Sequence, residues 1–192
     1  MKLGLIICAA ALWCVAPVKA ADLGAFASYW DPSDADDTYG GGAVLRFDFS
    51  QNLMMDVRIS HYEFVDRLND VRRSLKVTPL EAGVTLDLLS DPQLAVYVGG
   101  GIGYYLADGD ISAGATRADL DISNSAGYFA LGGFRVRLSP KLRFFGEAKY
   151  TWLEYDAPTS KDTRRPMPGG DLFAGDLDME GIGINVGFLY RF

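Results

Sequence analysis

The sequence predicts an all-β fold, an eight-stranded antiparallel up-and-down transmembrane β-barrel. Apolar side chains recur at every second position in eight segments, which is the pattern of strands with one apolar face. Short polar turns alternate with longer polar connections between these segments, as expected for a membrane barrel with an even number of strands. No run of about 18 apolar residues, the length that a membrane-spanning helix needs, follows the first 20 residues.

The first 20 residues have the features of a secretory signal peptide. Lys2 supplies the positive charge, Leu3–Val15 the apolar run, and Val18–Ala20 a small-x-small cleavage site. We therefore expect export and cleavage after residue 20. The remaining residues, 21–192, are enough for one domain, which we expect to be the barrel.

Composition excludes several functions. Cys8 and Cys14 both lie in the leader, so the exported chain has no cysteine for a disulfide, a thiol nucleophile or a metal site. Two of the 18 basic residues also lie there, which leaves 16 basic against 25 acidic residues and a net charge of −9. This charge argues against nucleic-acid binding through a basic surface. No cofactor and no metal site are predicted.

Four strands are predicted in the first half of the domain. They cover about Leu23–Trp30, Gly41–Phe49, Leu53–Ser60 and Lys76–Leu88. The last three have apolar faces formed by Ala43, Leu45, Phe47 and Phe49; by Leu53, Met55, Val57 and Ile59; and by Leu80, Ala82, Val84, Leu86 and Leu88. The lipid face of the first strand stays open. Pro79 lacks the N–H that a strand paired on both sides uses, so we expect a bulge or the upper end of the strand there.

Four more strands are predicted in the second half. They cover about Leu94–Tyr104, Tyr128–Leu138, Leu142–Trp152 and Ile182–Phe192. The last is the most regular, since Ile182, Ile184, Val186, Phe188, Tyr190 and Phe192 alternate with small or polar residues. The glycines at 99–101 are not followed by a helical pattern, so we interpret them as positions of close approach or as room for a large neighbour.

The connections between the predicted strands alternate in length. Tight turns are expected near 50–52, 89–93 and 139–141, and longer loops near 31–39, 63–74, 107–124 and 156–178. Aromatic residues also gather at both ends of the strands, as they do at membrane interfaces. Those toward the turns are Phe47, Phe49, Phe134, Phe144, Tyr190 and Phe192, and those toward the loops are Tyr62, Tyr104, Tyr128, Tyr150, Trp152 and Tyr155.

The final strand resembles the C-terminal signal strand of bacterial outer-membrane barrels in its terminal Phe192 and in Tyr190 and Phe188. Residues 77–89 and 97–105 resemble the central hairpin of the small outer-membrane β-barrel family, which includes OmpA-type, OmpX/Ail-type and Opa-type proteins. The resemblance implies a monomer in the bacterial outer membrane. It also implies that the partners are outer-membrane lipids, lipopolysaccharide and the barrel-assembly machinery. The resemblance leaves open whether the protein also binds an extracellular ligand.

Charged residues occur on the faces predicted to line the lumen. They are Arg46, Asp48, Asp56, Arg58, Glu81, Asp87, Arg135, Arg137, Arg143, Glu147 and Lys149. The turn at 50–52 places Arg46 opposite Asp56, an attractive cross-strand pair, whereas the turn at 139–141 places Arg137 opposite Arg143, a repulsive one unless acids intervene. Because an eight-stranded interior holds little more than side chains, we expect a packed salt-bridge network. A charged conduction path is the alternative.

Function follows less directly than fold, because small barrels serve as adhesins, anchors and narrow channels. The leading hypothesis is a non-enzymatic structural or surface-interaction protein that acts through four outer loops. The alternatives are a narrow channel for small or hydrophobic solutes, similar to OmpW, and a lipid A-modifying enzyme of the PagP or PagL kind. Ser60, His61 and Glu63 lie together, but neighbouring strand residues point to opposite faces. The acids of the outer loops and the pairs Arg72–Arg73 and Arg164–Arg165 are candidate contacts to cations or lipid phosphates.

Overall fold

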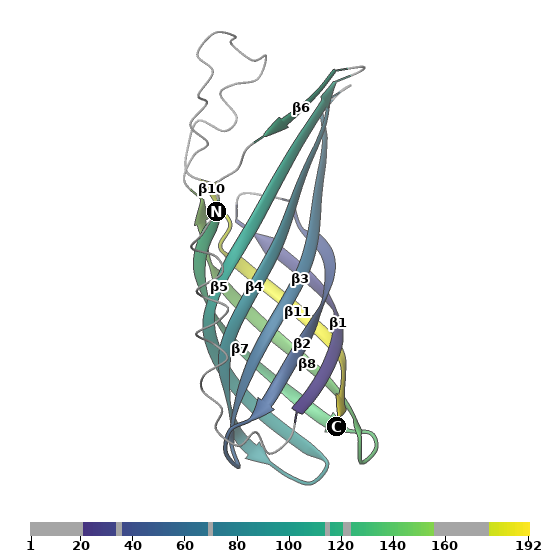
Figure 1. Cartoon of the computed structure of the whole chain (residues 1–192), viewed down its shortest axis with the longest axis vertical. Coiled ribbons are helices and arrows are strands. Elements are labelled where there is room, and N and C mark those ends of the chain that lie inside the picture. The colour runs from purple at the N-terminus through teal and green to yellow at the C-terminus, as the bar shows by residue number, and fades with distance from the viewer. Residues whose placement is uncertain (1–20, 34–35, 69–70, 114–115, 121–123, 156–176) are drawn as a thin grey trace.

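The computed structural model describes residues 21–33, 36–68, 71–113, 116–120, 124–155 and 177–192, and the signal-peptide prediction lies outside them. The described part is built of β-strands (Figure 1). They are β1 (Ala21–Pro32), β2 (Thr38–Asp48), β3 (Leu53–Leu68), β4 (Val71–Ser90), β5 (Leu94–Ala113), β6 (Thr116–Leu120), β7 (Ser125–Arg137), β8 (Leu142–Trp152), β9 (Glu154–Tyr155), β10 (Leu177–Asp178) and β11 (Gly181–Arg191). None of the described segments is a helix long and apolar enough to cross a membrane.

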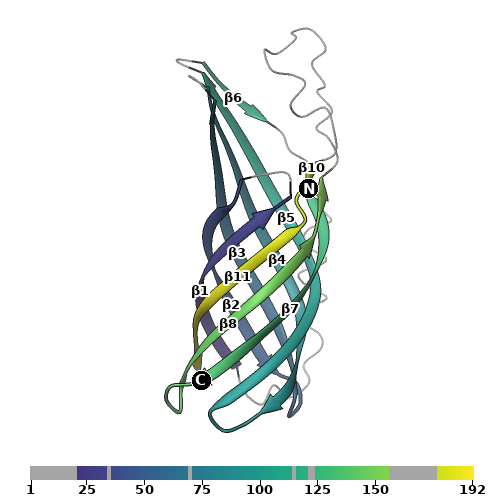
Figure 2. The same ribbon diagram turned by 180° about the vertical axis from the view of Figure 1, so that it is seen from behind.

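Eight of these strands close into an antiparallel barrel. The order runs β4-β3-β2-β1-β11-β8-β7-β5, and β5 pairs again with β4. The first and last strands lie side by side, with Ala25 opposite Phe188. Figure 2 shows the wall formed by β1, β11, β8 and β7. The predicted fold class is therefore confirmed.

The barrel wall has an apolar outer face and a buried inner face. In β3, Val57 is 50% exposed on the outside while Arg58 is 3% exposed inside. The same alternation runs through β11, where every second residue from Gly181 to Leu189 is buried. It also settles the face of β1, which turns Leu23 outward and Phe26 and Trp30 inward.

The tight turns lie together at one end of the barrel (Figure 1). Each is closed by a backbone hydrogen bond, from Ser50 N to Leu53 O (2.9 Å) in the first and from Ser139 N to Leu142 O (3.0 Å) in the third. We call this the turn end, and we expect it to face the periplasm because short turns do so in membrane barrels of this kind.

The expectation for Pro79 was wrong. β4 continues through this residue, and the β3–β4 ladder is only interrupted there, between the pairs Ile59–Leu80 and Tyr62–Val77, without a change of register. A proline removes one donor from the ladder, which is enough to interrupt it. The bulge in β4 lies instead between Asp87 and Leu89, near the turn end.

Two of the predicted loops, 63–74 and 107–124, are largely strands. β3 continues to Leu68 and β4 begins at Val71, while β5 continues to Ala113 and pairs with β6. β3, β4 and β5 rise well above the other strands, with β6 beside them (Figures 1 and 2). The charged residues of segments 63–74 and 107–124 suggested loops. A strand above the membrane has no lipid-facing side, however, and tolerates charged residues on both faces.

Glycines on the inner face leave room for large neighbours. A Cβ at Gly83 would lie 2.9 Å from Cζ of Phe129, and one at Gly99 would lie 2.6 Å from Cγ2 of Thr85. A Cβ at Gly103 would meet the ring of Tyr105 at 2.6 Å. Phe129, Thr85 and Tyr105 all lie in the barrel interior, so the glycines help to set which side chains fill it.

Candidate functional site in the barrel lumen

The middle of the lumen is crossed by a chain of buried ion pairs. Arg46 donates from Nε and Nη2 to the two carboxylate oxygens of Asp56, at 2.6 and 2.7 Å. Asp56 also accepts from Nη2 of Arg58 at 2.7 Å, and Arg58 in turn pairs with Glu147 on the far wall. All four side chains are at most 2% exposed. The register places Arg46 directly opposite Asp56, as the turn at 50–52 predicts.

Glu147 is the centre of this network. Besides Arg58, it accepts hydrogen bonds from Oη of Tyr97 and from Nδ2 of Asn185, each at 3.0 Å. Asn185 is held by Ser28, whose Oγ donates to its Oδ1 at 2.5 Å. A buried carboxylate needs such donors because an unpaired charge in a low-dielectric interior costs several kcal/mol.

A second buried pair lies on the outer side of this network. Nζ of Lys149 donates to Oε1 of Glu81 at 2.6 Å, and the hydroxyl of Tyr105 donates to the same oxygen at 3.0 Å. Lys149 also lies 5.6 Å from the ring centroid of Phe129. Several buried polar atoms of the described interior have no partner: Nη1 of Arg46, Nε of Arg58, Oγ1 of Thr85 and Nε1 of Trp30.

The turn end of the lumen holds a third set of charges. Arg135 donates from Nη2 to both oxygens of Asp87, at 2.9 and 2.7 Å. Asp22 accepts from Arg143 at 2.6 Å and from Arg191 at 2.8 Å. Arg191 also reaches Asp48 at 2.5 Å.

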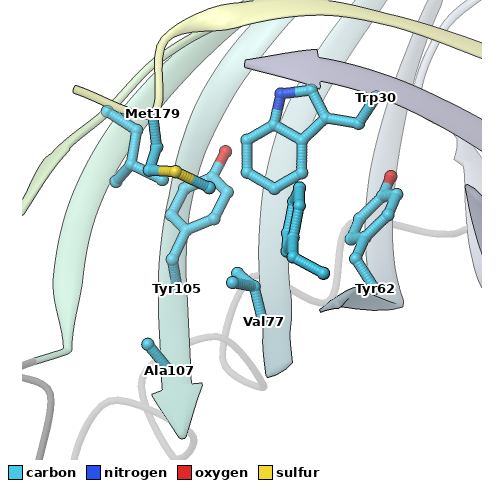
Figure 3. Packing of buried hydrophobic residues seen from close by; sticks show 8 residues of the cluster. Trp30, Tyr62, Val77, Tyr105, Ala107 and Met179 are labelled. Atoms are coloured by element: carbon cyan, nitrogen blue, oxygen red, sulfur yellow. The ribbon is translucent and has the colours of Figure 1, made fainter. Parts of the chain in front are cut away.

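The outer end of the lumen is filled by apolar side chains instead (Figure 3). The cluster consists of Trp30, Tyr62, Phe64, Val77, Tyr105, Ala107, Leu153 and Met179. The ring of Trp30 packs against Tyr62 and Phe64, with centroids 5.1 and 5.7 Å away. Tyr62 is only 2% exposed and hydrogen-bonds to Ser28 at 2.7 Å, so its assignment to the outer aromatic belt was wrong. The error arose because β3 carries even-numbered residues inward beyond Ser60.

The structure brings ten of the eleven charged lumen candidates into ion pairs. Arg137 is the exception, since it makes no ion pair with any residue that the structure describes, although it lies opposite Arg143 as expected. Sequence reasoning missed Asp22 and Arg191, which complete the turn-end set, and the donors Tyr97 and Asn185. Extending the alternation of the first strand by one residue would have placed Asp22 inside.

The residues considered for an enzyme do not converge. Ser60 is buried on the inner face, whereas His61 is exposed on the outer face and has its Nδ1 3.0 Å from Oγ1 of Thr78. No group of His, Cys, Asp and Glu in the described residues could hold a metal ion. Four of the loop acids (Asp34, Asp121, Asp171 and Asp176) and Arg164–Arg165 lie outside the described residues, and so do the side chains of Asp110, Asp119 and Arg72–Arg73.

The aromatics of the final strand lie on the outer face. Phe188, Tyr190 and Phe192 are 51%, 45% and 71% exposed. Phe188 packs edge-on against Phe144 of β8 at a centroid distance of 5.6 Å, and Tyr190 packs against Phe192 at 5.5 Å. This arrangement leaves the three rings available to lipid or to another protein, and their role as an assembly signal stays a prediction.

A closed barrel with an apolar outer face and a filled, charged interior defines a membrane-spanning β-barrel protein. The chain belongs to the outer membrane protein beta-barrel domain family, whose model matches residues 6–192. This membership places it in the bacterial outer membrane and confirms the family that the sequence resembles. A comparison with curated protein sequences finds no match.

Solved structures share the fold at low sequence identity. Neisserial surface protein A is 12% identical, with a TM-score of 0.61 over 89% of this chain and 95% of that one. Ail of Yersinia pestis is 11% identical, with a TM-score of 0.54 over 90% and 97%. A major outer membrane protein of Thermus thermophilus is 16% identical, with a TM-score of 0.55 over 90% and 100%. Ail has also been solved with the heparin analogue sucrose octasulfate.

Proposed function

We propose that this protein is a non-enzymatic surface-interaction protein that uses its barrel as an anchor and its extracellular strands and loops to contact ligands. The observation that carries the proposal is the contrast between a filled lumen and the tall sheet of β3, β4, β5 and β6 above it (Figure 1). A lumen blocked by apolar side chains at its outer end and by ion pairs at its middle transports poorly, whereas an extended sheet offers area for recognition.

A narrow channel is the alternative, and the interior argues against it. A solute moving through the barrel would have to displace the apolar cluster around Trp30 and then the Arg58–Glu147 pair. The inward charges also oppose a route for hydrophobic solutes. Conductance in planar bilayers tests this: we expect no stable open state, and steady single-channel currents would favour the channel.

An enzyme acting on lipid A is disfavoured by the opposite orientations of Ser60 and His61. Expression of the protein in a host with known lipid A, followed by mass analysis, tests this point. We expect no change in lipid A mass; a new acyl or deacylated species would favour the enzyme.

The ligand class that we propose is a polyanion, such as a sulfated glycan. Cross-strand pairing places Arg67 opposite Arg72, Arg72 opposite Ser112, and Ser112 opposite Arg117, so three register positions of one row across the sheet are arginines. Arginine suits sulfate and phosphate groups because its guanidinium binds two oxygens at once. The heparin analogue found with Ail supports the same ligand chemistry.

Heparin binding to the folded protein in non-ionic detergent tests the ligand class. We expect the triple change Arg67→Gln, Arg72→Gln and Arg117→Gln to abolish most binding, and Lys76→Gln, lower on the same sheet, to have little effect. Binding that is unchanged in the triple variant would exclude this row. Outer-membrane lipids, lipopolysaccharide and the assembly machinery are the other partners that we propose, with monomeric insertion after cleavage of the leader at residue 20.

A further inference from the structure

The turn end of the lumen contains a cavity of about 170 Å³ that the ion-pair network does not fill. Its lining includes the guanidinium-bearing residues Arg135, Arg137, Arg143 and Arg191. Turn residues such as Gln51 and Gln93 complete the rim, so the cavity opens toward the periplasm. Three carboxylates, those of Asp48, Asp87 and Asp91, line the same cavity.

Three of these arginines are held by carboxylates. Arg135 is paired with Asp87, and Arg143 and Arg191 share Asp22, with Arg191 also reaching Asp48. Arg137 is exposed and makes no ion pair among the described residues. Asp91 also lines the cavity, but its Oδ1 accepts from the Gln93 amide at 3.2 Å and it lies beyond ion-pair distance of Arg137.

The position of Arg137 is unfavourable as it stands. It lies directly opposite Arg143 in the β7–β8 ladder, and side chains at directly opposite positions start about 5 Å apart, where like charges destabilise a sheet. The backbone N–H of Arg137 donates to Gln93 O at 2.9 Å. This bond fixes the end of the strand, so the backbone cannot move Arg137 away from Arg143. A counter-anion between the two guanidinium groups would reverse the sign of this interaction.

We propose that this cavity is a binding site for a phosphate group, either free or as a monoester, drawn from the periplasmic side. A phosphate carries up to two charges and several acceptor oxygens, so it can bind Arg137 and Arg143 together. A cavity of about 170 Å³ has room for a small anionic group.

The test uses the protein folded in a non-ionic detergent that contains no phosphate, with inorganic phosphate, glycerol 3-phosphate and acetate titrated separately by calorimetry. We expect phosphate binding that is weakened about tenfold by Arg137→Gln, as for the loss of one charge-assisted hydrogen bond, and largely kept by Arg137→Lys. Lys141→Gln is the matched control, because Lys141 belongs to the same strand end but lies outside the cavity, near the ring of Tyr190.

Urea unfolding supplies a second readout that does not depend on calorimetry. Without phosphate, Arg137→Gln should raise the unfolding midpoint, because it removes the repulsion with Arg143. Added phosphate should raise the midpoint of the wild type but not of the variant. A preference for glycerol 3-phosphate would identify a monoester such as a lipid headgroup, and a preference for inorganic phosphate a free ion. Binding of acetate alone, no binding, or equal losses in Arg137→Gln and Lys141→Gln would overturn the proposal.

Discussion

The middle and the outer end of the same lumen are filled by opposite chemistry. The middle is crossed by guanidinium and carboxylate groups whose partners come from different strands, whereas the outer end is packed with aromatic and aliphatic side chains around Trp30. In the middle a single change leaves a buried charge without its partner. At the outer end it leaves only a smaller apolar contact. The comparison teaches that replacing a residue of the ion-pair network destabilises the barrel more than replacing a residue of the apolar cluster, although both levels block the lumen.

The largest effect is expected from Arg58→Gln. This change removes the cation between Asp56 and Glu147 and leaves two buried carboxylates with fewer donors. We expect a loss of about 3–5 kcal/mol in the free energy of unfolding, as for other broken buried pairs. Reversible urea unfolding in lipid vesicles measures it, with the surface change Lys76→Gln as control. A loss below about 1 kcal/mol would mean that the network relaxes easily. The middle of the lumen would then be no less tolerant of substitution than the outer end.

Val57→Arg tests the wall next to the same site. Val57 is 50% exposed on the outer face, and we place it near the middle of the membrane. An arginine there should cost about 2–4 kcal/mol, the penalty for a cation near the bilayer midplane. Val57→Leu, which keeps the apolar face, should be close to neutral in the same urea assay. Tolerance of the arginine would move this part of β3 out of the hydrocarbon region.

These two neighbours also show how far the sequence could predict the structure. Period-two alternation placed Val57 outside and Arg58 inside, and a tight turn was enough to pair Arg46 with Asp56, which are close in the chain. The partner of Arg58 on the far wall is 89 residues away. That contact depends on how the strands are staggered around the closed barrel, which no local pattern specifies.

The upper part of the molecule was harder to predict for a different reason. Within the membrane, lipid on one face of a strand and a packed lumen on the other impose the alternation of apolar and polar residues. Above the membrane no lipid contacts the strands, so this alternation is not imposed. The strands at 63–68 and 107–113 therefore have a composition that also suits loops. Tyr62 was misplaced by the same uncertainty, since an aromatic at the rim suits either the interface or the interior.

A smaller effect is expected from Tyr97→Phe, which removes one hydroxyl and keeps the ring. That hydroxyl donates to Glu147 at 3.0 Å, and Tyr97 itself is fully buried. A hydrogen bond to a charged group contributes about 1.5–3 kcal/mol, so we expect a loss in this range from urea unfolding. Tyr128→Phe, on the exposed outer face, serves as the control. Equal effects of the two changes would show that Glu147 is adequately held by Arg58 and Asn185.

The smallest effect is expected from Trp30→Phe at the outer end. This change also removes a polar group from a buried aromatic, but Nε1 of Trp30 has no hydrogen-bond partner. The substitution loses part of the contact with Tyr62 and Phe64 and at the same time relieves a buried donor that is already unsatisfied. Because these two terms oppose each other, we expect a net loss of about 1 kcal/mol or less. The same urea assay measures it beside Tyr97→Phe. A loss larger than that of Tyr97→Phe would indicate that the indole N–H binds a group inside the cluster, and the outer end would then be polar in the same sense as the middle.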